Sequence, residues 1–489
     1  MTKTFYEKLW SVICRSSENF YIYYNDRQSY PALRTNIEKL NGLLADRYQQ
    51  RIVVYSEKSF ETYCVLFSIL LSENTWIPLS PGHPENRTLK AFELCRPDVI
   101  FTDRPLPAKL ATFAANNNCQ IIDLHTAIND TSRIPLVLGN FDKNDIAYIM
   151  FTSGSTGAPK GVPMTHLNYV NFVENAMTIL PFKKGDVFSD YHDLGFDISI
   201  FYLFCAILAE GALSPFLRDE EKFVPIDHII KNEITVWSSV PSAILNLTRL
   251  RPHDQIATPL RIMFLCGEPF RLDVLKYCYD NMAIESVYNF YGLTETGVEN
   301  FYHACTPEDV QRFEKKGFVP IGKPLAGNQV RVSENKELLI TGCQVTPGYL
   351  GGIGTERFSE FNGAIWYHTG DFVEVEDGLF YCKGRADSQV KLSGFRIELM
   401  DIEVCTRALP GISDAVCFLQ EGKRRTHLSC AIETSITIDT SVVTEHLNNE
   451  LPSYMVPTRF LFLEAFPRNA NGKVDRNIVS KLAESDLTS

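Results

Sequence analysis

The chain has 489 residues, which is too long for a single hydrophobic core and predicts two or more domains. Hydrophobic residues make up 45% of the sequence and charged residues 22%, as in ordinary water-soluble globular enzymes. The formal net charge of −12 argues against a nucleic-acid-binding protein, because the sequence offers no basic stripe.

The thirteen cysteines are dispersed, and none of them forms a CxxC pair or a Cys/His cluster with the spacing of a zinc site. The first ten residues, MTKTFYEKLW, lack the apolar segment of a signal peptide. The longest apolar runs, such as residues 65–71, are too short to span a bilayer. We therefore expect free thiols, no membrane insertion and a cytoplasmic location.

Residues 1 to about 140 alternate short apolar strands with amphipathic stretches. Residues 51–55 and 98–101 predict strands, and residues 59–71 predict a helix. Such alternation favours a mostly parallel sheet covered by helices. The expected fold class is α/β, with a large N-terminal domain of this kind and a small, mobile C-terminal α+β domain.

A candidate phosphate-binding loop follows an apolar run at residues 146–151, which predicts a buried strand. Its glycines let backbone N–H groups approach an anion closely, its hydroxyls add donors, and Lys160 adds a positive charge. The spacing differs from the P-loop of ordinary nucleotidases, and a Ser/Gly-rich linker is the alternative interpretation. The candidate residues of this loop are Thr152, Ser153, Gly154, Ser155, Thr156, Gly157 and Lys160.

The residues after this loop predict a helix whose N-terminus faces the anion. Thr165 can cap this helix, and apolar residues from Leu167 to Leu180 follow a helical period. The positive end of the helix dipole would favour a bound anion. His166 lies at this end, where we expect it to be packed or solvated rather than catalytic.

Residues 191–201 place two carboxylates, Asp193 and Asp197, in a run that is otherwise largely apolar. A buried carboxylate is costly unless it is paired. Two interpretations of this segment stay open. In one, an aspartate caps the following helix, and in the other it is the counter-ion of a small cationic group on a ligand.

Three further segments, at residues 235–241, 262–268 and 286–295, are short apolar strands that end in small, polar or turn residues. In an open parallel sheet the carboxyl ends of the strands form the ligand crevice, so these ends would converge on one cleft. There a glutamate could hold a magnesium ion and a tyrosine could stack on a purine. The candidate residues are Ser238, Cys266, Gly267, Glu268, Tyr291, Thr294 and Glu295.

The last candidates lie in the C-terminal third of the chain. Asp371 follows a tight turn and is suited to hydrogen-bonding a ribose diol. The polar, glycine-punctuated residues 384–403 predict a junction between two domains, and Lys473 lies on a Gly/Asn turn beyond it. The expected division is a large domain at residues 1–385, a hinge at residues 386–388 and a small domain at residues 389–489.

Five segments carry a resemblance to a known family, and in chain order they read TSGSTGAPKG, NFYGLTE, YHTGD, GRADSQVKLSGFRIEL and NGKVDR. With this order and spacing, the chain resembles the adenylate-forming superfamily over nearly its whole length. Within the superfamily it is most similar to stand-alone amino acid–carrier protein ligases, such as those for D-alanine or glycine. The supporting local features are TVWSSVPS, FLCGE and the FD-x-S of residues 196–199.

The resemblance implies a two-step reaction that uses ATP and Mg²⁺. An amino acid and ATP give an aminoacyl-adenylate and pyrophosphate, and the acyl group then passes to the phosphopantetheine thiol of a carrier protein. The sequence ends at residue 489, sixteen residues after Lys473. We therefore expect the carrier to be a separate protein and the enzyme to be a monomer outside any multimodular synthetase.

The resemblance also implies roles for the candidate residues, motif by motif. Residues 153–160 would hold the β- and γ-phosphates, Thr294 would contact the α-phosphate, and Glu295 would bind the magnesium ion. Lys473 would bridge the substrate carboxylate, the α-phosphate and the ribose, and Asp387 would be the hinge between the half-reactions. The residues implied for the adenosine are Gly267, Glu268, Asn289, Phe290 and Tyr291 at the base, and Asp371 with Arg385 at the ribose.

Asp197 falls where the superfamily binds a substrate α-ammonium group, so we expect an amino acid rather than a fatty or aryl acid. Three phenylalanines make the expected side-chain pocket small, which favours glycine first and D- or L-alanine second. Cys266 matches a cysteine of the D-alanine ligases. Glu299 is anomalous, because it could pair with a cationic side chain or could simply fill space. The pocket residues are Ile198, Phe201, Ser238, Phe264, Cys266, Phe290, Val298 and Glu299.

Two features depart from the family pattern. Leu293 stands where proline is commonest in NFYGLTE, and residues 298–312 are unlike the D-alanine ligases. Two other functions stay open at this point. One is an acyl- or aryl-CoA synthetase of the same superfamily, and the other is a scaffold protein that binds ATP without catalysis.

Overall fold

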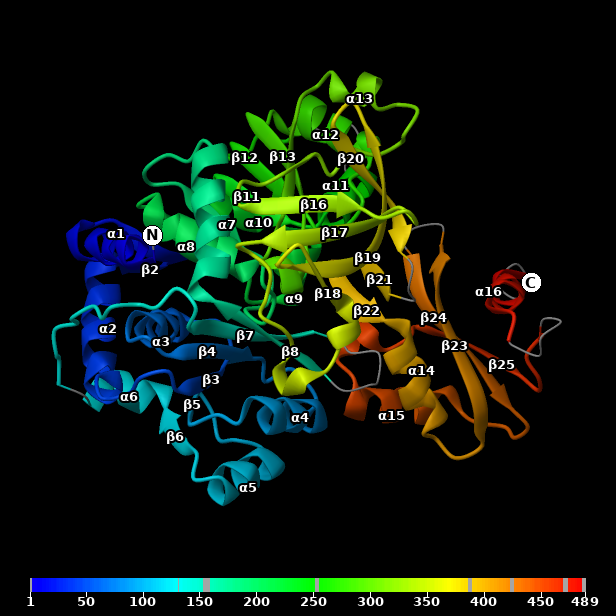
Figure 1. Ribbon diagram of the computed structural model, residues 1–489, viewed down its shortest axis with the longest axis horizontal. Coiled ribbons are helices and arrows are strands. Elements are labelled where there is room, and N and C mark those ends of the chain that lie inside the picture. The colour runs from blue at the N-terminus through cyan, green and yellow to red at the C-terminus, as the bar shows by residue number, and fades with distance from the viewer. Residues whose placement is uncertain are drawn as a thin grey trace.

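The computed structural model describes residues 2–130, 132–152, 159–250, 255–385, 389–422, 426–468 and 474–485. In Figure 1 the N-terminal and central parts of the chain form one broad body, and the C-terminal part lies against one side of it. The body contains two mostly parallel sheets covered by helices and a smaller antiparallel sheet. The predicted α/β class, with a small C-terminal α+β region, is confirmed.

The nine-stranded sheet carries most of the residues predicted for the ligand crevice. Its strands, in sheet order, are β15 (Lys323–Pro324), β14 (Phe301–Cys305), β13 (Ser286–Tyr291), β12 (Ile262–Leu265), β11 (Val236–Ser239), β9 (Val187–Asp190), β10 (Ala212–Pro215), β1 (Asn19–Tyr23) and β2 (Asp26–Ser29). The strands from β13 to β1 are all parallel, and antiparallel strands extend both edges. The ends of β11, β12 and β13 therefore meet at one edge, as predicted.

The six-stranded sheet holds the strand that precedes the candidate phosphate loop. Its strands, in sheet order, are β6 (Gln120–Asp123), β5 (Val99–Thr102), β3 (Arg51–Tyr55), β4 (Thr75–Leu79), β7 (Ile146–Thr152) and β8 (Lys160–Thr165). All neighbours are parallel except β7 and β8, which pair antiparallel and bring Thr152 opposite Lys160. The strands predicted at residues 51–55 and 146–151 are confirmed, and β5 begins one residue later than predicted.

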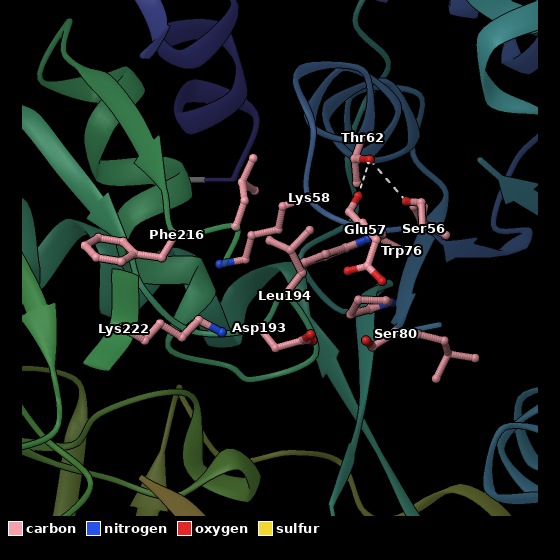
Figure 2. A pocket seen from close by; sticks show the side chains of 14 residues that line it. Ser56, Glu57, Lys58, Thr62, Trp76, Ser80, Asp193, Leu194, Phe216 and Lys222 are labelled. Carbon is pink, nitrogen blue, oxygen red and sulfur yellow. Dashed lines mark hydrogen bonds between the residues drawn. The ribbon is translucent and has the colours of Figure 1, made fainter. Parts of the chain in front are cut away.

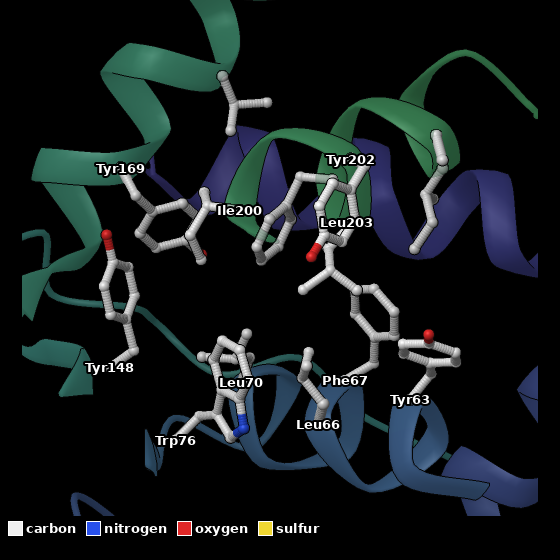
Figure 3. Close-up of a cluster of buried hydrophobic side chains, with 14 of the residues drawn as sticks. Tyr63, Leu66, Phe67, Leu70, Trp76, Tyr148, Tyr169, Ile200, Tyr202 and Leu203 are labelled. Atoms are coloured by element: carbon white, nitrogen blue, oxygen red, sulfur yellow. The ribbon is translucent and has the colours of Figure 1, made fainter. Parts of the chain in front are cut away.

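A hydrophobic core between these two sheets holds them together. Five helices supply much of it: α1 (Thr2–Arg15), α2 (Tyr30–Leu44), α3 (Phe60–Leu71), α7 (His166–Ile179) and α8 (Ser199–Leu208). Figure 3 shows Tyr63 and Phe67 of α3 pointing toward Tyr202 and Leu203 of α8. These aromatic side chains are fully buried, and burial of such large apolar surface is the main stabilising term of the core.

Helix α7 begins as the sequence predicts. The Thr165 hydroxyl accepts a hydrogen bond from the backbone N–H of Asn168, and the Asn168 side chain accepts one from the backbone N–H of Thr165, which makes a capping box. His166 is buried, and its Nδ1 atom lies 2.5 Å from the Tyr6 hydroxyl oxygen. Burial lowers the pKa of His166 to about 4, so this histidine is a packed, neutral residue.

Further helices cover the outer faces of the two sheets. The six-stranded sheet packs against α4 (Glu85–Cys95) and α5 (Ala108–Asn116), with α6 (Leu124–Asp130) beside α2 and α3. The nine-stranded sheet packs against α10 (Ile226–Lys231), α11 (Pro241–Leu250) and α12 (Leu272–Met282). Two short helices, α9 (Asp219–Phe223) and α13 (Asp309–Arg312), lie in connections.

The third sheet of the body is antiparallel and carries Asp371 and Arg385. Its strands are β16 (Asn328–Val332), β17 (Glu337–Gly342), β19 (Ala364–Glu376), β18 (Phe358–Phe361) and β20 (Leu379–Arg385). Strands β19 and β20 pair so that Asp371 lies opposite Arg385. Three short 3₁₀ segments belong to this part of the chain: η1 (Thr294–Thr296), η2 (Leu350–Gly352) and η3 (Thr355–Arg357).

The C-terminal region has a hydrophobic core of its own, drawn from residues 390–462. It begins with a hairpin of β21 (Gln389–Leu392) and β22 (Phe395–Glu398). A three-stranded sheet of β23 (Ile412–Glu421), β24 (Thr426–Thr434) and β25 (Arg459–Leu463) follows, with α14 (Leu399–Arg407), α15 (Thr440–Glu450), η4 (Ser453–Met455) and α16 (Arg476–Ser485). In the part of the chain that the structure describes, no helix combines the length and the apolar character needed to cross a bilayer.

A buried ion pair ties the two large sheets together. Lys58 follows β3, and its Nζ atom lies 2.6 Å from Oδ1 of Asp190, the last residue of β9. The Tyr63 hydroxyl donates a second hydrogen bond to the same carboxylate. Figure 2 shows Lys58 beside a cavity of about 340 Å³ that opens between the sheets. Burial lowers the pKa of Lys58, and Asp190 partly offsets that shift.

We expect Lys58→Met to lower the free energy of unfolding by roughly 3–5 kcal/mol, because it would leave the Asp190 carboxylate buried without its cation. Urea unfolding would measure the loss. The double variant Lys58→Met/Asp190→Asn is the matched control and should recover most of it, because neither charge is then buried and the Tyr63 hydroxyl keeps an acceptor. A loss below about 1 kcal/mol for the single variant would mean that the pair does not hold the sheets together.

Candidate functional site

The candidate site is a cavity of about 90 Å³ at the edge where β11, β12 and β13 end. It is lined by residues from the crevice predicted from the sequence and by three residues of the C-terminal hairpin, which had been predicted only as part of a domain junction. The predicted residues are Asp197, Ile198, Cys266, Gly267, Thr294, Val298 and Glu299. The hairpin residues are Lys391, Gly394 and Arg396.

The three phenylalanines predicted as pocket walls stack on one another, and none of them is among the residues that line this cavity. The ring centroids of Phe201 and Phe264 are 4.1 Å apart, and those of Phe264 and Phe290 are also 4.1 Å apart. All three rings are buried. Ser238 is also buried, and its hydroxyl has no hydrogen-bond partner among the described residues. These four predicted pocket residues are therefore buried but do not line the cavity.

Asp197 is a half-buried carboxylate at one wall of the cavity. Burial raises its pKa to about 6, and a hydrogen bond from Thr294 opposes that shift. The negative charge of nearby Glu295 raises it further. A cation bound in the cavity would favour the charged form of Asp197.

Glu295 lies in η1, directly after β13, and is almost completely buried. The Tyr349 hydroxyl donates to its Oε1 at 2.7 Å, and Arg396 Nη1 donates to its Oε2 at 2.9 Å. Burial alone would raise the pKa of Glu295, but Arg396 and the hydrogen bond from Tyr349 lower it to about 2. Glu295 is therefore ionised at neutral pH and has the chemistry of a ligand for a hard cation such as Mg²⁺.

Glu299 is the second carboxyl group that lines the cavity, with Asp197. It is 4% exposed, and its Oε2 atom has no hydrogen-bond partner within the described part of the structure. Burial raises the pKa of Glu299 to about 8, and Asp197 raises it further, whereas the Cys266 thiol and Lys391 lower it. The thiol of Cys266 in turn has its pKa raised by burial and by Glu299.

The residues predicted for the adenosine lie beside the cavity. The Tyr291 hydroxyl donates to Asp371 at 2.5 Å, and Arg385 Nη1 donates to the other oxygen of Asp371 at 2.7 Å. Glu268 accepts hydrogen bonds from the backbone N–H groups of Ser242 and Gly394. The predicted Tyr291, Asp371 and Arg385 are thus brought together, and Glu268 contacts the hairpin.

The side chain of Asn289 is already used inside the fold, since its Nδ2 atom donates to the Pro320 carbonyl at 2.8 Å. Gly267 has φ +80°, a conformation that favours glycine, at the turn after β12. The Asn289 side chain is therefore held in place by the fold, and the turn after β12 has a backbone conformation that favours glycine at Gly267.

The stem of the candidate phosphate loop reaches the site through Tyr349. Thr152 and Lys160 pair across β7 and β8, and Lys160 Nζ lies 5.4 Å from the centroid of the Tyr349 ring, whose hydroxyl contacts Glu295. The Thr152 hydroxyl is buried without a partner among the described residues. The predicted residues that lie outside the described ranges are Ser153, Gly154, Ser155, Thr156 and Gly157 of the loop, the hinge residue Asp387 and the catalytic candidate Lys473.

The hairpin β21–β22 covers the cavity from the C-terminal side. Besides Arg396, it contributes Gly394, whose backbone N–H donates to Glu268 Oε1 at 2.8 Å. Lys391 Nζ lies 5.7 Å from the centroid of the Tyr291 ring. The sequence shows the motif that contains these residues. It does not show their contacts with the ends of β12 and β13, because those contacts join residues that are far apart in the chain.

One group of possible metal ligands lies outside the cavity. His303, Cys305 and Asp309 bring their ligand atoms within 4.8 Å of one another at β14 and α13. His303 Nε2 is 2.8 Å from Asp309 Oδ2, so an ion pair already accounts for two of the three side chains. The sequence spacing of this group is not that of a zinc motif.

The chain is similar to known proteins along most of its length. The sequence model of the family described as AMP-binding enzyme matches residues 14–350. The D-alanine–D-alanyl carrier protein ligase of Staphylococcus epidermidis is 28% identical, over 94% of this chain and 94% of that protein. The L-proline–[L-prolyl-carrier protein] ligase of Streptomyces coelicolor is 32% identical, over 88% of this chain and 87% of that protein.

Two solved structures have the same fold. The Vibrio cholerae adenylation domain AlmE, in complex with glycyl-adenosine-5'-phosphate, superposes with a TM-score of 0.84 at 21% identity, over 98% of each chain. The structure of IdnL7 superposes with a TM-score of 0.70 at 26% identity, over 99% of each chain.

We expect Asp197→Asn to raise the free energy of unfolding at pH 7.5 by roughly 1–3 kcal/mol, because the raised pKa shows that burial disfavours the charged form. The gain should be present above pH 6 and should vanish below about pH 4, where the aspartate is protonated in both the folded and unfolded states. Urea unfolding at several pH values would measure it. Asp193→Asn is the matched control, and an equal gain for both variants would contradict the assignment of the effect to burial of Asp197.

Proposed function

The chain belongs to the family of AMP-binding enzymes, and we propose that it uses ATP to activate a small amino acid and then passes it to the phosphopantetheine thiol of a carrier protein. The observation that carries this proposal is the closeness of two carboxylates: Asp197 lines the small cavity, and Glu295 lies near enough to raise the pKa of Asp197 and is bound to Arg396, another residue of the lining. A carboxylate that binds an α-ammonium group lies beside a carboxylate that can neutralise a metal ion. Relatives named as D-alanine and L-proline carrier protein ligases support it.

The proposed first step joins two anions, since the carboxylate of the amino acid attacks the α-phosphorus and displaces pyrophosphate. Preorganised positive charge is the main catalytic device for such a step. Thr294 would donate to the α-phosphate, and Lys160 and Lys473 would supply positive charge. A magnesium ion, when bound, would neutralise phosphate oxygens, and Glu295 is the residue that would hold it.

The ribose would bind at Asp371, which Arg385 and Tyr291 hold in place. The adenine would lie between the turn at Gly267 and the Tyr291 ring. In the second step the carrier thiol attacks the acyl carbonyl, and AMP leaves with the bonding pair. Each of these roles follows from the resemblance and is a proposal for this chain.

The contact between Arg396 and Glu295 conflicts with the first step, in which Glu295 would hold a metal ion. Its guanidinium now lies on Glu295, and a metal ion on that carboxylate would compete with it for the same charge. We propose that the hairpin moves away for the first step, that residues 386–388 are the hinge, and that Lys473 then reaches the site. The large unit at residues 1–385 and the small unit at residues 389–489 would be the two parts that rotate.

The size of the cavity favours a small substrate. About 90 Å³ holds several water molecules, and the three stacked phenylalanines are buried. By volume alone glycine ranks first and D- or L-alanine second. The preference for glycine over alanine would be small, because one methyl group in a pocket changes the free energy of discrimination by only about 1–3 kcal/mol.

A pyrophosphate-exchange assay across the twenty L-amino acids, D-alanine and short diamino acids would test this proposal. We expect exchange with small amino acids and little with large apolar ones. Asp197→Ala should lower kcat/KM for the amino acid on the order of 100-fold, because a charged hydrogen bond to the ammonium is lost. Preference for a large residue, or equal use of acids without an amine, would contradict the proposal. Coenzyme A accepted as readily as a carrier would favour an acyl-CoA synthetase instead.

We expect Lys473→Ala nearly to abolish adenylate formation, because the variant removes the cation that the proposal assigns to the α-phosphate. Pyrophosphate exchange would measure the loss. Lys481→Ala is the control, since Lys481 is an exposed lysine of the same C-terminal segment. Exchange by Lys473→Ala at close to the wild-type rate would show that this lysine has been given the wrong role.

A further inference from the structure

The cavity contains a carboxyl group that glycine or alanine would leave without a partner. Glu299 lines the cavity and is 4% exposed, and its Oε2 atom makes no hydrogen bond with any described residue. Its carboxyl interacts with the neighbouring Cys266 thiol, a weak donor. A buried polar atom of this kind is costly whether the carboxyl is ionised or protonated, so the fold retains it against its own stability.

The backbone that carries Glu299 is held in a strained conformation. Val298 has φ +71°, a left-handed value that is a genuine outlier for a β-branched residue. Gln344 Nε2 donates to the carbonyl oxygens of Gly297 and Glu299, at 2.6 and 2.7 Å. A Cβ atom on Gly292 would lie 2.4 Å from the Cα atom of Glu299, so the preceding turn packs directly against it. These contacts fix the carboxyl at the cavity.

The charges around Glu299 do not neutralise it. Asp197, the other carboxylate of the amino-acid pocket, raises the pKa of Glu299, and the substrate α-ammonium would satisfy Asp197 alone. Of the two nearby cations, Arg396 is bound to Glu295 and Lys391 lies over the ring of Tyr291. A simple amino acid would bring one cation to these two carboxyl groups, and the other cations that line the cavity, Lys391 and Arg396, come from the hairpin.

We propose that Glu299 binds an ammonium group on the side chain of the substrate, so that the preferred amino acid is a short diamino acid. The inference rests on the proposed function and refines its substrate class. The limited cavity favours a side chain with one or two methylene groups, as in 2,3-diaminopropionate or 2,4-diaminobutyrate. Each ammonium would then face its own carboxylate, Asp197 for the α-position and Glu299 for the side chain.

Selectivity follows from the same contact. Glycine and alanine would fit by volume but would leave the Glu299 oxygen unpaired, and a site built to hydrogen-bond a substrate group rejects analogues that lack it. If Glu299 only filled space, replacing it with a residue of the same shape would leave the ranking of substrates unchanged.

The test is pyrophosphate exchange by the full-length enzyme with both enantiomers of the two diamino acids, and with glycine, alanine, serine and β-alanine. We expect the wild-type enzyme to prefer one of the diamino acids. Glu299→Gln, which keeps the shape and removes the charge, should lower the ratio of kcat/KM for that diamino acid over alanine roughly 10- to 100-fold. Glu334→Gln, at an exposed site, is the matched control and should leave this ratio unchanged.

The outcomes separate the inference from the proposed function. Wild-type preference for glycine, alanine, serine or β-alanine would overturn the inference and leave amino-acid activation standing. An equal loss for all substrates in Glu299→Gln would overturn it as well, because a merely structural role has that effect. Absence of exchange with every amino acid would overturn the proposed function itself. If Glu299→Gln does not fold, the wild-type ranking still decides the inference.

Discussion

The site depends on one buried carboxylate, Glu295, because three parts of the fold meet at it. The residue itself follows the central strand β13, Tyr349 comes from the segment before η2, and Arg396 comes from the C-terminal hairpin. A carboxylate that is 1% exposed keeps its charge only while such partners remain. The hydrogen bonds of Glu295 therefore join the hairpin, the nine-stranded sheet and the segment before η2.

Buried carboxyl groups lie close together around Glu295, and their burial lowers the stability of the fold. Asp197 and Glu299 have raised pKa values because they are buried near other carboxyl groups, whereas Glu295 is kept ionised by Arg396 and Tyr349. Perturbed carboxyl groups of this kind cluster where proteins bind or transform ligands. The cations that would relieve the strain come from outside the body: from the ligand, from a metal ion or from the hairpin.

The local features of the site could be predicted from the sequence. The strands before the phosphate loop and the crevice, the Thr165 cap and the carboxylates at the strand ends all leave periodic or turn signals within a few residues. The sequence could not show that the three phenylalanines stack on one another instead of lining the cavity, because side-chain direction depends on packing. Nor could it show that Arg396 lies on Glu295, since 101 positions separate the pair. The left-handed conformation of Val298 lies beside close contacts with Gly292 and with Gln344, which is distant in the sequence, and it has no signal in the residues around it.

The aromatic contact between the C-terminal region and the body is apolar, unlike the ion pair of Arg396 and Glu295. Phe395 stacks on Tyr454 of its own region at 4.0 Å, while Phe196, the neighbour of Asp197, meets Phe395 edge-on at 5.4 Å. If the region rotates, the stacked pair travels as a unit, and the contacts of Phe196 with Phe395 and Tyr454 part. This aromatic contact is apolar and has no hydrogen bond that must be re-formed, so the two surfaces can shift past each other. The ion pair between Arg396 and Glu295 would then be the contact that holds the region in place.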